Sequence, residues 1–379
     1  MKKETDITII GAGASGLMLA ALLENKNILL LDNNNKIGSK ILVSGGGKCN
    51  ITNGNVKSKN YLGEQRFIQN VIKRFDQNAL LIWLAKRGLK PIIRKNNQYF
   101  CENSAKELTN LLEKEINYKD IVLNTMVESV KKIDNGFEVF TNKGKIKTKK
   151  VVVATGGLSF PKIGATDIGY KISETFGHEV STLTAGLVGF TVQPEQFFFK
   201  TLSGVSTEVK ITIDKKTISG SLLFTHKGIS GPAVLDASLY WNKGKIAIDF
   251  IPSIDINILK SSKKNISNVL GLSNRVSKTF LNKLNVEDKR CSQLNKDEWC
   301  KIELLKNYTF APAGTFGYSK AEVTKGGVML NKIDASSMMS KNVDNLYFLG
   351  EVLDVTGELG GYNFQWAFSS AFVCAKDLN

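Results

Sequence analysis

The chain has 379 residues, 42% of which are hydrophobic, and it carries a formal net charge of +16 at pH 7. A chain of this length can bury a large core and favours about two or three domains, and so large a positive charge attracts polyanions. Five cysteines without a C-x-x-C pair and only two histidines argue against a disulfide framework, a thiolate zinc site and a histidine metal cluster, so we expect no metal.

A glycine-rich turn near the N-terminus is the strongest motif. It reads Gly-Ala-Gly-Ala-Ser-Gly and lies between a predicted strand at 6–10 and a predicted helix at 17–23. Gly11 permits the tight turn, Gly13 lets the backbone approach a pyrophosphate, and Gly16 lets the helix pack closely on the strand. The turn therefore predicts a dinucleotide cradle.

The residues around this turn complete the nucleotide-binding pattern. Ala14 and Ser15 stand where the first amides of the helix would face phosphates. A second predicted strand at 27–31 ends in Asp32, 21 positions after Gly11, where an acid accepts hydrogen bonds from a ribose diol. Strand, glycines, helix, strand and acid in this order predict binding of an adenine dinucleotide.

The apolar stretch at 7–23, behind Lys2 and Lys3, raises the alternative of a targeting segment. Glu4 and Asp6 spoil a basic leader, and three glycines interrupt the stretch. No other stretch offers the roughly 18 uninterrupted apolar residues that a membrane span needs. We expect a soluble, cytoplasmic protein that does not associate with a membrane.

The patterning along the chain predicts an α/β protein with a discontinuous first domain. Helical spacing is expected at 67–86, 105–115 and from about Phe364, a strand meander at 121–153, and strands at 208–213, 246–250 and 346–349. Helical spacing among many Lys, Asn and Ser residues also marks 253–310. The predicted domains are a nucleotide-binding domain at 1–190 plus 331–379, an inserted β domain at 191–252 plus 311–330, and a helical domain at 253–310.

Two further glycine turns indicate which dinucleotide is bound. The apolar strand at 151–154 runs into Thr155, Gly156 and Gly157, and the strand at 346–349 runs into Gly350 and Glu351. Both turns suit FAD: the backbone at Gly350 could approach the ribityl and pyrophosphate chain.

The segment from Glu351 to the start of the last helix supplies further expected contacts with the flavin. Glu351 or Asp354 would accept a hydrogen bond from a ribityl hydroxyl. Gly360, Gly361, Tyr362 and Asn363 open the final helix, and a helix N-terminus aimed at the flavin pyrimidine would stabilise negative charge there. Phe364 and Trp366 follow, and their alternative role is to pack this helix.

Several long motifs together resemble one family. They are KILVSGGGKCNITN at 40–53, ATGGLSFPKIGATDIGY at 154–170, FTHKGISGPAVL at 224–235, VTKGGV at 323–328 and YFLGEVLDVTGELGGYNFQWAFSS at 347–370. The chain resembles the BaiN/RdsA-like bacterial FAD-dependent oxidoreductases, also labelled the aminoacetone oxidase family. The resemblance implies a Rossmann-like FAD domain of glutathione-reductase type, an inserted β-barrel-like domain and a small helical domain. The first of these motifs adds to the expected cofactor-binding residues Lys40, Ser44, Gly46, Gly47 and Asn50, and Val127 is also expected to contact the cofactor.

The resemblance also implies an activity: reduction of a uridine to dihydrouridine in 23S ribosomal RNA. In that chemistry, flavin N5 delivers hydride to a C=C bond conjugated to a carbonyl, and a side-chain acid protonates the neighbouring carbon. The alternatives are a small-molecule oxidase or enone reductase, acting on an aminoacetone-type or steroid-like substrate, and a non-catalytic protein stabilised by FAD. The +16 charge suits RNA, although only six of the basic residues are Arg.

Two residues are candidate proton donors. Cys49 follows three glycines, and its alternative role is to seat that loop as a small buried residue. His226 lies in a Thr-His-Lys-Gly turn that we expect to face the flavin, and its alternative role is a hydrogen bond to backbone. Lys48 and Lys227 could hold phosphates or a flavin carbonyl. No second G-x-G-x-x-G occurs, so NADH or NADPH is expected to visit the flavin transiently as a small-molecule reductant.

Overall fold

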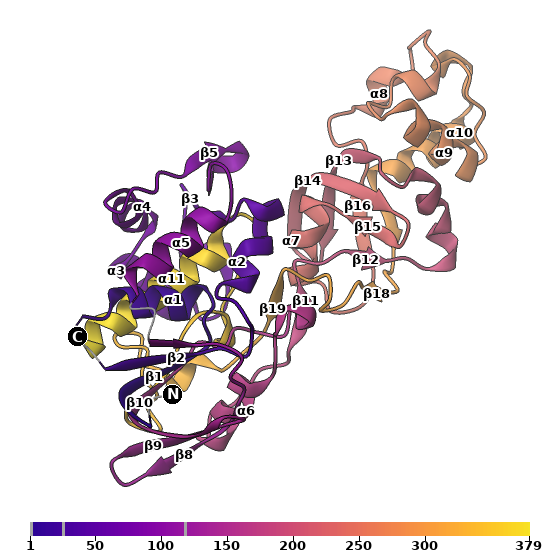
Figure 1. The fold of residues 1–379 in the computed structure, drawn as a ribbon. Coiled ribbons are helices and arrows are strands. Elements are labelled where there is room, and N and C mark those ends of the chain that lie inside the picture. The colour runs from indigo at the N-terminus through magenta and orange to yellow at the C-terminus, as the bar shows by residue number, and fades with distance from the viewer. Residues whose placement is uncertain (1–2, 25–26, 117–119) are drawn as a thin grey trace. The chain divides into compact units, whose positions relative to one another are not determined.

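A computed structural model describes residues 3–24, 27–116 and 120–379 (Figure 1). The chain divides into two compact units. Unit 1 comprises Met1–Thr184 and Val323–Asn379, and unit 2 comprises Ala185–Glu322. Unit 1 is therefore built from both ends of the chain, while the finer division into three domains stays a prediction.

The centre of unit 1 is a seven-stranded sheet. Its strands are β1 (Glu4–Ile10), β2 (Ile28–Leu31), β7 (Ile121–Val122), β8 (Val127–Ile133), β9 (Gly136–Thr141), β10 (Gly144–Val153) and β20 (Leu346–Phe348). The order is β7-β2-β1-β10-β9-β8, and β20 also pairs with β10. The pairs among β7, β2, β1, β10 and β20 are parallel, whereas β8, β9 and β10 form an antiparallel meander. The predicted strands at 6–10 and 27–31 and the meander are confirmed.

Helices lie on and around this sheet, and some of them pack on other helices (Figure 1). They are α1 (Ala14–Leu22), α2 (Ser39–Val43), α3 (Gln65–Arg74), α4 (Gln77–Ala85), α5 (Lys106–Glu115), α6 (Ile168–Thr175) and α11 (Tyr362–Leu378). The predicted helix at 67–86 is two helices, because the Asp76 side chain accepts a hydrogen bond from the Ala79 amide at 2.9 Å and starts a new one. Phe75, at the break, stacks on Phe372 of α11 with ring centroids 4.5 Å apart.

Short strands complete unit 1. They are β3 (Asn50–Asn53), β4 (Tyr61–Leu62), β5 (Ile92–Arg94), β6 (Gln98–Phe100), β19 (Val323–Lys325) and β21 (Thr356–Gly357). β3, β6 and β5 form a three-stranded antiparallel sheet, and β4 pairs with β21. Another short strand, β11 (Thr184–Gly186), lies where the chain passes from unit 1 to unit 2.

Unit 2 is built on a second seven-stranded sheet. Its strands are β12 (Phe190–Thr191), β13 (Ser206–Ile213), β14 (Lys216–Thr225), β15 (Gly228–Ser230), β16 (Ile246–Asp249), β17 (Tyr308–Phe310) and β18 (Gly314–Thr315), in the order β17-β16-β13-β14-β15-β12-β18. Its helices are α7 (Pro232–Tyr240), α8 (Ile256–Leu259), α9 (Asn274–Lys283) and α10 (Lys296–Glu303). The predicted strands at 208–213 and 246–250 are confirmed as β13 and β16.

One hydrophobic core joins the sheet and the helices of unit 2. Phe280 of α9 packs on Phe250 with ring centroids 4.7 Å apart, and Phe199 lies within 6.1 Å of both rings. Aromatic rings of this size dominate the energetics of a core. The helical stretch at 253–310 therefore depends on the sheet for its buried face.

Over the described parts of the chain, no helix is both long and apolar enough to cross a membrane. The same residues contain no group of three or more His, Cys, Asp or Glu side chains that could hold a metal ion.

His178 is a buried titratable group of unit 1. Its Nε2 hydrogen-bonds the Ser340 hydroxyl at 2.8 Å, and its ring lies edge-on to Phe348 at 5.0 Å. Burial lowers the pKa of His178, and the positive charge of Lys332 lowers this pKa further. The folded protein therefore holds the neutral imidazole.

We expect His178 to make unit 1 sensitive to acid. As the pH falls below about 6.5, the unfolded chain binds a proton that the folded chain refuses, so the free energy of unfolding drops by at most about 1.4 kcal/mol per pH unit. Thermal unfolding from pH 8 to pH 5 should show a shallower loss for His178→Asn than for the wild type. His226→Asn, which removes the other histidine from an exposed position, is the control. Equal slopes for wild type and His178→Asn would contradict this account.

Candidate functional site

Four strands of unit 1 end together at one edge of the sheet. Ile10 of β1 lies opposite Leu31 of β2 and Val153 of β10, and Val153 lies opposite Phe348 of β20. In open α/β sheets, ligands bind outside the carboxyl ends of the strands. The predicted cradle, the predicted acid and both later glycine turns directly follow these four ends. The structure therefore brings together sequence segments from both ends of the chain.

The three cradle glycines have different surroundings. A Cβ on Gly11 would lie 2.4 Å from the Ala154 carbonyl oxygen, and a Cβ on Gly16 would lie 1.9 Å from the Gly11 carbonyl oxygen. A Cβ on Gly13 would meet no atom within 4 Å. Gly11 and Gly16 are thus required by the packing of the protein itself, whereas the space beside Gly13 is open, as a bound pyrophosphate requires.

The N-terminus of α1 is suited to an anion. Gly13 is its N-cap residue and offers no side-chain oxygen, and the first turn contains no acidic residue. The first amides of a helix have no partner within the helix, and they carry the positive end of its dipole. Ala14 and Ser15, in that first turn, therefore stand where phosphate oxygens would accept hydrogen bonds.

Asp32 lies beside the cradle and also organises it. One carboxylate oxygen accepts a hydrogen bond from the Ala12 amide at 2.7 Å, and the other accepts from the Asn34 amide at 2.8 Å. The Asn34 side-chain amide also donates to the second oxygen, at 2.9 Å. A carboxylate offers about four acceptor positions, so these three bonds leave room for one ribose hydroxyl.

Glu351 is the centre of a polar network rather than an isolated acceptor. Its Oε2 lies 2.6 Å from the Lys40 ammonium, and its Oε1 accepts hydrogen bonds from the Ser159 hydroxyl at 3.0 Å and the Thr324 amide at 2.8 Å. The Thr324 hydroxyl in turn accepts a hydrogen bond from the Leu158 amide at 2.7 Å. The network ties together α2, the loop after β10, β19 and the turn after β20. Of these residues, the sequence predicted Lys40 and Glu351.

The two later glycine turns are tightly packed. A Cβ on Gly157 would lie 2.5 Å from the Thr324 hydroxyl, and a Cβ on Gly350 would lie 2.7 Å from the Ser15 hydroxyl. The Gly350 amide donates to the Ser370 hydroxyl at 3.1 Å, and its carbonyl accepts from the Trp366 indole at 3.0 Å. Gly350 therefore lets β20 approach α1. Trp366 is buried and packs α11, which was the alternative role that the sequence offered for it.

The start of α11 is fixed by its neighbours. The Asn363 side chain accepts from the Gly357 amide at 2.8 Å and donates to the Gly357 carbonyl at 2.9 Å. Gly360 and Gly361 both have positive φ, of 133° and 93°, and a Cβ on Gly361 would lie 2.6 Å from the Thr52 carbonyl oxygen. Tyr362 packs edge-on to Tyr61 at 5.9 Å.

The remaining predicted cofactor residues are spread more widely over unit 1. Asn50 starts β3 and pairs with the Gln98 side chain at 3.0 Å, and the Ser44 hydroxyl donates to the Ile41 carbonyl at 2.7 Å. Val127 is a buried residue at the start of β8. The others lie in turns after α2 and β10, namely Gly46, Gly47, Thr155 and Gly156. Their contacts with FAD stay predictions.

Beside this network lies a pair of which the sequence predicted only one member, Asp354, as a cofactor-binding residue, and missed the other, Lys325. Lys325 of β19 and Asp354, which follows β20, are both half-buried and attract each other. Burial lowers the pKa of Lys325, and the negative charge of Asp354 opposes that shift. Burial raises the pKa of Asp354, while a hydrogen bond from Ser181 and the charge of Lys325 oppose the rise. The only sequence signal for Lys325 was its place in the VTKGGV motif.

The two predicted proton donors lie in different units. Cys49 of unit 1 is fully buried, and burial raises the pKa of its thiol well above the usual range. Its backbone has φ 46°, and its amide donates to the Ser44 carbonyl at 3.1 Å. These surroundings favour the alternative role of Cys49 as a small residue that seats the glycine loop. His226 is exposed and belongs to unit 2.

Comparison with known proteins supports a flavoenzyme. Residues 5–377 match the family model described as HI0933-like protein Rossmann domain. The chain is 40% identical over 390 residues to the ribosomal RNA dihydrouridine synthase of Escherichia coli K12, covering 98% of both chains. It is 28% identical over 412 residues to the 3-dehydro-bile acid delta(4,6)-reductase of Clostridium scindens, again covering 98% of both.

Among solved structures, the chain resembles 3-ketosteroid delta1-dehydrogenase from Sterolibacterium denitrificans. The TM-score is 0.54 at 12% identity, covering 100% of this chain and 99% of the other. At that identity the likeness concerns the fold, which is the Rossmann-type fold of an FAD-binding protein.

Gly13 and Gly16 make a matched pair for testing the cradle. Gly13→Ala should keep the stability of the wild type, because its Cβ enters open space, and should weaken FAD binding at least tenfold, about 1.4 kcal/mol. Gly16→Ala should lower the free energy of unfolding by about 1–3 kcal/mol even without FAD, because its Cβ overlaps backbone. Fluorescence titration with FAD and urea unfolding of the apoprotein measure the two effects. Wild-type FAD affinity in Gly13→Ala would contradict the assignment.

Proposed function

The chain belongs to the HI0933-like Rossmann family and is an FAD-dependent oxidoreductase, and on that premise we propose that it reduces a uridine of 23S ribosomal RNA to dihydrouridine. The proposed substrate rests on the 40% identity, over 98% of both chains, to a protein named ribosomal RNA dihydrouridine synthase. The net charge of +16 supports attraction to RNA. A protein that modifies ribosomal RNA acts in the cytoplasm, so we also propose a cytoplasmic location.

FAD fits the cradle described above. The open space at Gly13 and the uncapped start of α1 would take its pyrophosphate, and Asp32 would take a ribose hydroxyl. The bound cofactor supplies a carrier of hydride equivalents. The Glu351 network holds the surrounding loops in place, so the protein does not have to reorganise them when the cofactor binds.

The reaction needs a proton as well as a hydride. Reducing the C5=C6 bond of uridine adds one hydride to the carbon remote from the conjugated carbonyl and one proton to the carbon next to it. We assign the source of the hydride to NADH or NADPH, which leaves as the oxidised nucleotide. The proton must come from a side chain or from a solvent path that the chain controls.

Lys325 is the proton donor that unit 1 supports best. It is half-buried beside Asp354. The amide of its chain neighbour Thr324 donates a hydrogen bond to the Glu351 carboxylate. Burial lowers the pKa of its ammonium group, which makes it a stronger acid than an exposed lysine. Cys49 remains a candidate only if the glycine loop opens.

We also propose that unit 2 consists of two domains. An inserted β-barrel-like domain at 191–252 plus 311–330 and a helical domain at 253–310 are supported by the sheet of unit 2 and by α8, α9 and α10.

A second candidate is reduction of a free enone. The 28% identity over 98% of both chains to a bile acid reductase favours it. The two reactions share their chemistry, because each adds hydride and a proton across a C=C bond conjugated to a carbonyl. They differ in the size and charge of the substrate.

Mapping of ribosomal RNA by mass spectrometry separates these candidates. Deletion of the gene should remove one dihydrouridine from 23S rRNA, and the wild-type gene should restore it. Gly13→Ala should restore it poorly, whereas His178→Asn is the matched control and should restore it fully. An unchanged modification pattern after deletion, together with saturable turnover of a free enone by the purified protein, would overturn the proposal.

Lys325 predicts a pH dependence. A general acid must be protonated, so the rate of reduction should fall as the pH rises through the lowered pKa of Lys325. Lys325→Met should slow reduction about 100-fold and leave bound FAD unchanged. Asp354→Asn should move the alkaline fall to lower pH, because it removes the charge that favours the protonated lysine. Single-turnover rates from pH 6 to pH 10 test this, and a wild-type profile in Asp354→Asn would exclude Lys325.

A further inference from the structure

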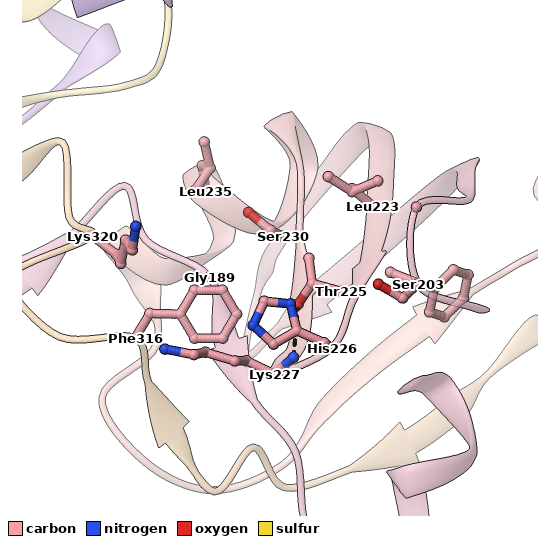
Figure 2. A pocket seen from close by; sticks show the side chains of 12 residues that line it. Gly189, Ser203, Leu223, Thr225, His226, Lys227, Ser230, Leu235, Phe316 and Lys320 are labelled. Carbon is pink, nitrogen blue, oxygen red and sulfur yellow. Dashed lines mark hydrogen bonds between the residues drawn. The ribbon is translucent and has the colours of Figure 1, made fainter. Parts of the chain in front are cut away.

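Unit 2 contains a cavity of about 540 Å³ that the function proposed above does not use. Twelve residues line it, all from unit 2 (Figure 2). They come from the end of β14, the turn into β15, the start of α7, and loop residues that include Gly189, Phe316 and Lys320. Its size falls in the usual range for small-molecule sites. We call it the His226 pocket.

The basic wall of the His226 pocket is a rigid turn. The Thr225 hydroxyl accepts hydrogen bonds from the amides of Lys227 at 3.3 Å and Gly228 at 3.1 Å. Gly228 has φ 150°, and a Cβ there would lie 2.2 Å from the Phe190 carbonyl oxygen. The turn is therefore held by its own hydroxyl and by close backbone packing, and it leaves the side chains of His226 and Lys227 exposed.

The aromatic wall is equally fixed. The Phe316 amide donates to the Gly189 carbonyl at 2.9 Å. A Cβ on Gly189 would lie 2.4 Å from the Phe316 ring, so only glycine lets the ring lie so close to this backbone. Figure 2 shows the Phe316 ring among the lining side chains, with those of His226 and Lys227 drawn near it in the same view. The lining thus combines a fixed aromatic ring with basic side chains.

The chemistry of the lining selects the ligand. Lys227, Lys320 and His226 offer nitrogen donors, and none of the twelve lining residues is Asp or Glu. The pocket therefore suits an anion and not a cation. Phe316 offers a face on which a flat ring can stack, with Leu223 adding apolar surface. A flat heterocycle carrying phosphate is a nucleotide, and stacking with lysine contacts to phosphate is how proteins hold unpaired nucleotides.

We infer that the His226 pocket binds a nucleotide, with its base on Phe316 and its phosphate at Lys227 and Lys320. Two sources share this chemistry: an unpaired nucleotide of the RNA substrate and a pyridine dinucleotide reductant. The inference deepens the proposed function and rests on it for the identity of the nucleotide. Binding to the pocket can nevertheless be measured without the reaction.

The experiment uses the full-length protein loaded with FAD and two probes, a single-stranded RNA hexamer containing uridine and NADPH. The pocket variants are Phe316→Leu, which keeps apolar bulk but loses the aromatic face, and the double variant Lys227→Gln with Lys320→Gln. The control is Lys243→Gln with Lys245→Gln, which removes the same charge from exposed positions of the same unit outside the pocket. Fluorescence anisotropy of the labelled hexamer and equilibrium dialysis of NADPH give the affinities.

We expect both pocket variants to lose at least tenfold in affinity for one probe, while the control loses less than twofold. If the pocket variants lose affinity for the hexamer, the pocket binds a nucleotide of the RNA substrate. If they lose affinity for NADPH, the pocket binds the reductant. Unchanged affinity for both probes, or an equal loss in the control, would overturn the inference even if the strain forms dihydrouridine. If the deletion leaves rRNA unchanged but the pocket variants lose binding, the proposed function fails and the pocket assignment stands.

Discussion

Parallel pairing of β1 with β2 and β10, and of β10 with β20, is the constraint on which the site depends. It aligns the last residues of four strands from both ends of the chain at one edge. The residues of β2 and β20 are buried along the whole of each strand, so side-chain packing on both faces of the sheet holds this register. Because the register is fixed, Gly11, Asp32 and Gly350 must emerge at the same edge of the sheet.

This edge is then held by charge as well as by backbone. The Glu351 carboxylate bonds to an ammonium group, a hydroxyl and an amide from three other segments. Removing one partner of such a half-buried charge leaves the other uncompensated, so the segments are bound into one unit. Glu351 therefore positions the loops that surround the cradle, a role distinct from the direct ribityl contact expected for it.

The sequence predicted those parts of the site that are encoded locally. Gly11, Gly13, Gly16 and Asp32 follow one another within a single βαβ unit, so their spacing alone carries the pattern. The break between α3 and α4 was also encoded locally, since Asp76 is a typical N-cap residue, but the apolar run across it hid the signal.

Long-range contacts could not be predicted in this way. Lys325 and Asp354 meet because β19 lies against the turn after β20, and no sequence spacing records that contact. The same holds for Thr324, whose amide donates to Glu351 and whose hydroxyl accepts from the Leu158 amide. Cys49 looked reactive from its place after three glycines, but its burial depends on how that loop folds back onto the core.

The two candidate proton donors are held by different interactions. Lys325 lies in the unit that contains the cradle, and its chain neighbour Thr324 donates its amide hydrogen bond to Glu351. The same network that fixes the loops around the cradle therefore also fixes the backbone that carries Lys325. His226 belongs to the other unit, in a turn held by the Thr225 hydroxyl, and it shares its pocket with Lys227, Phe316 and Lys320. The choice between the two donors is therefore a choice between a lysine supported by the Glu351 network and a histidine in the pocket that we assign to a nucleotide.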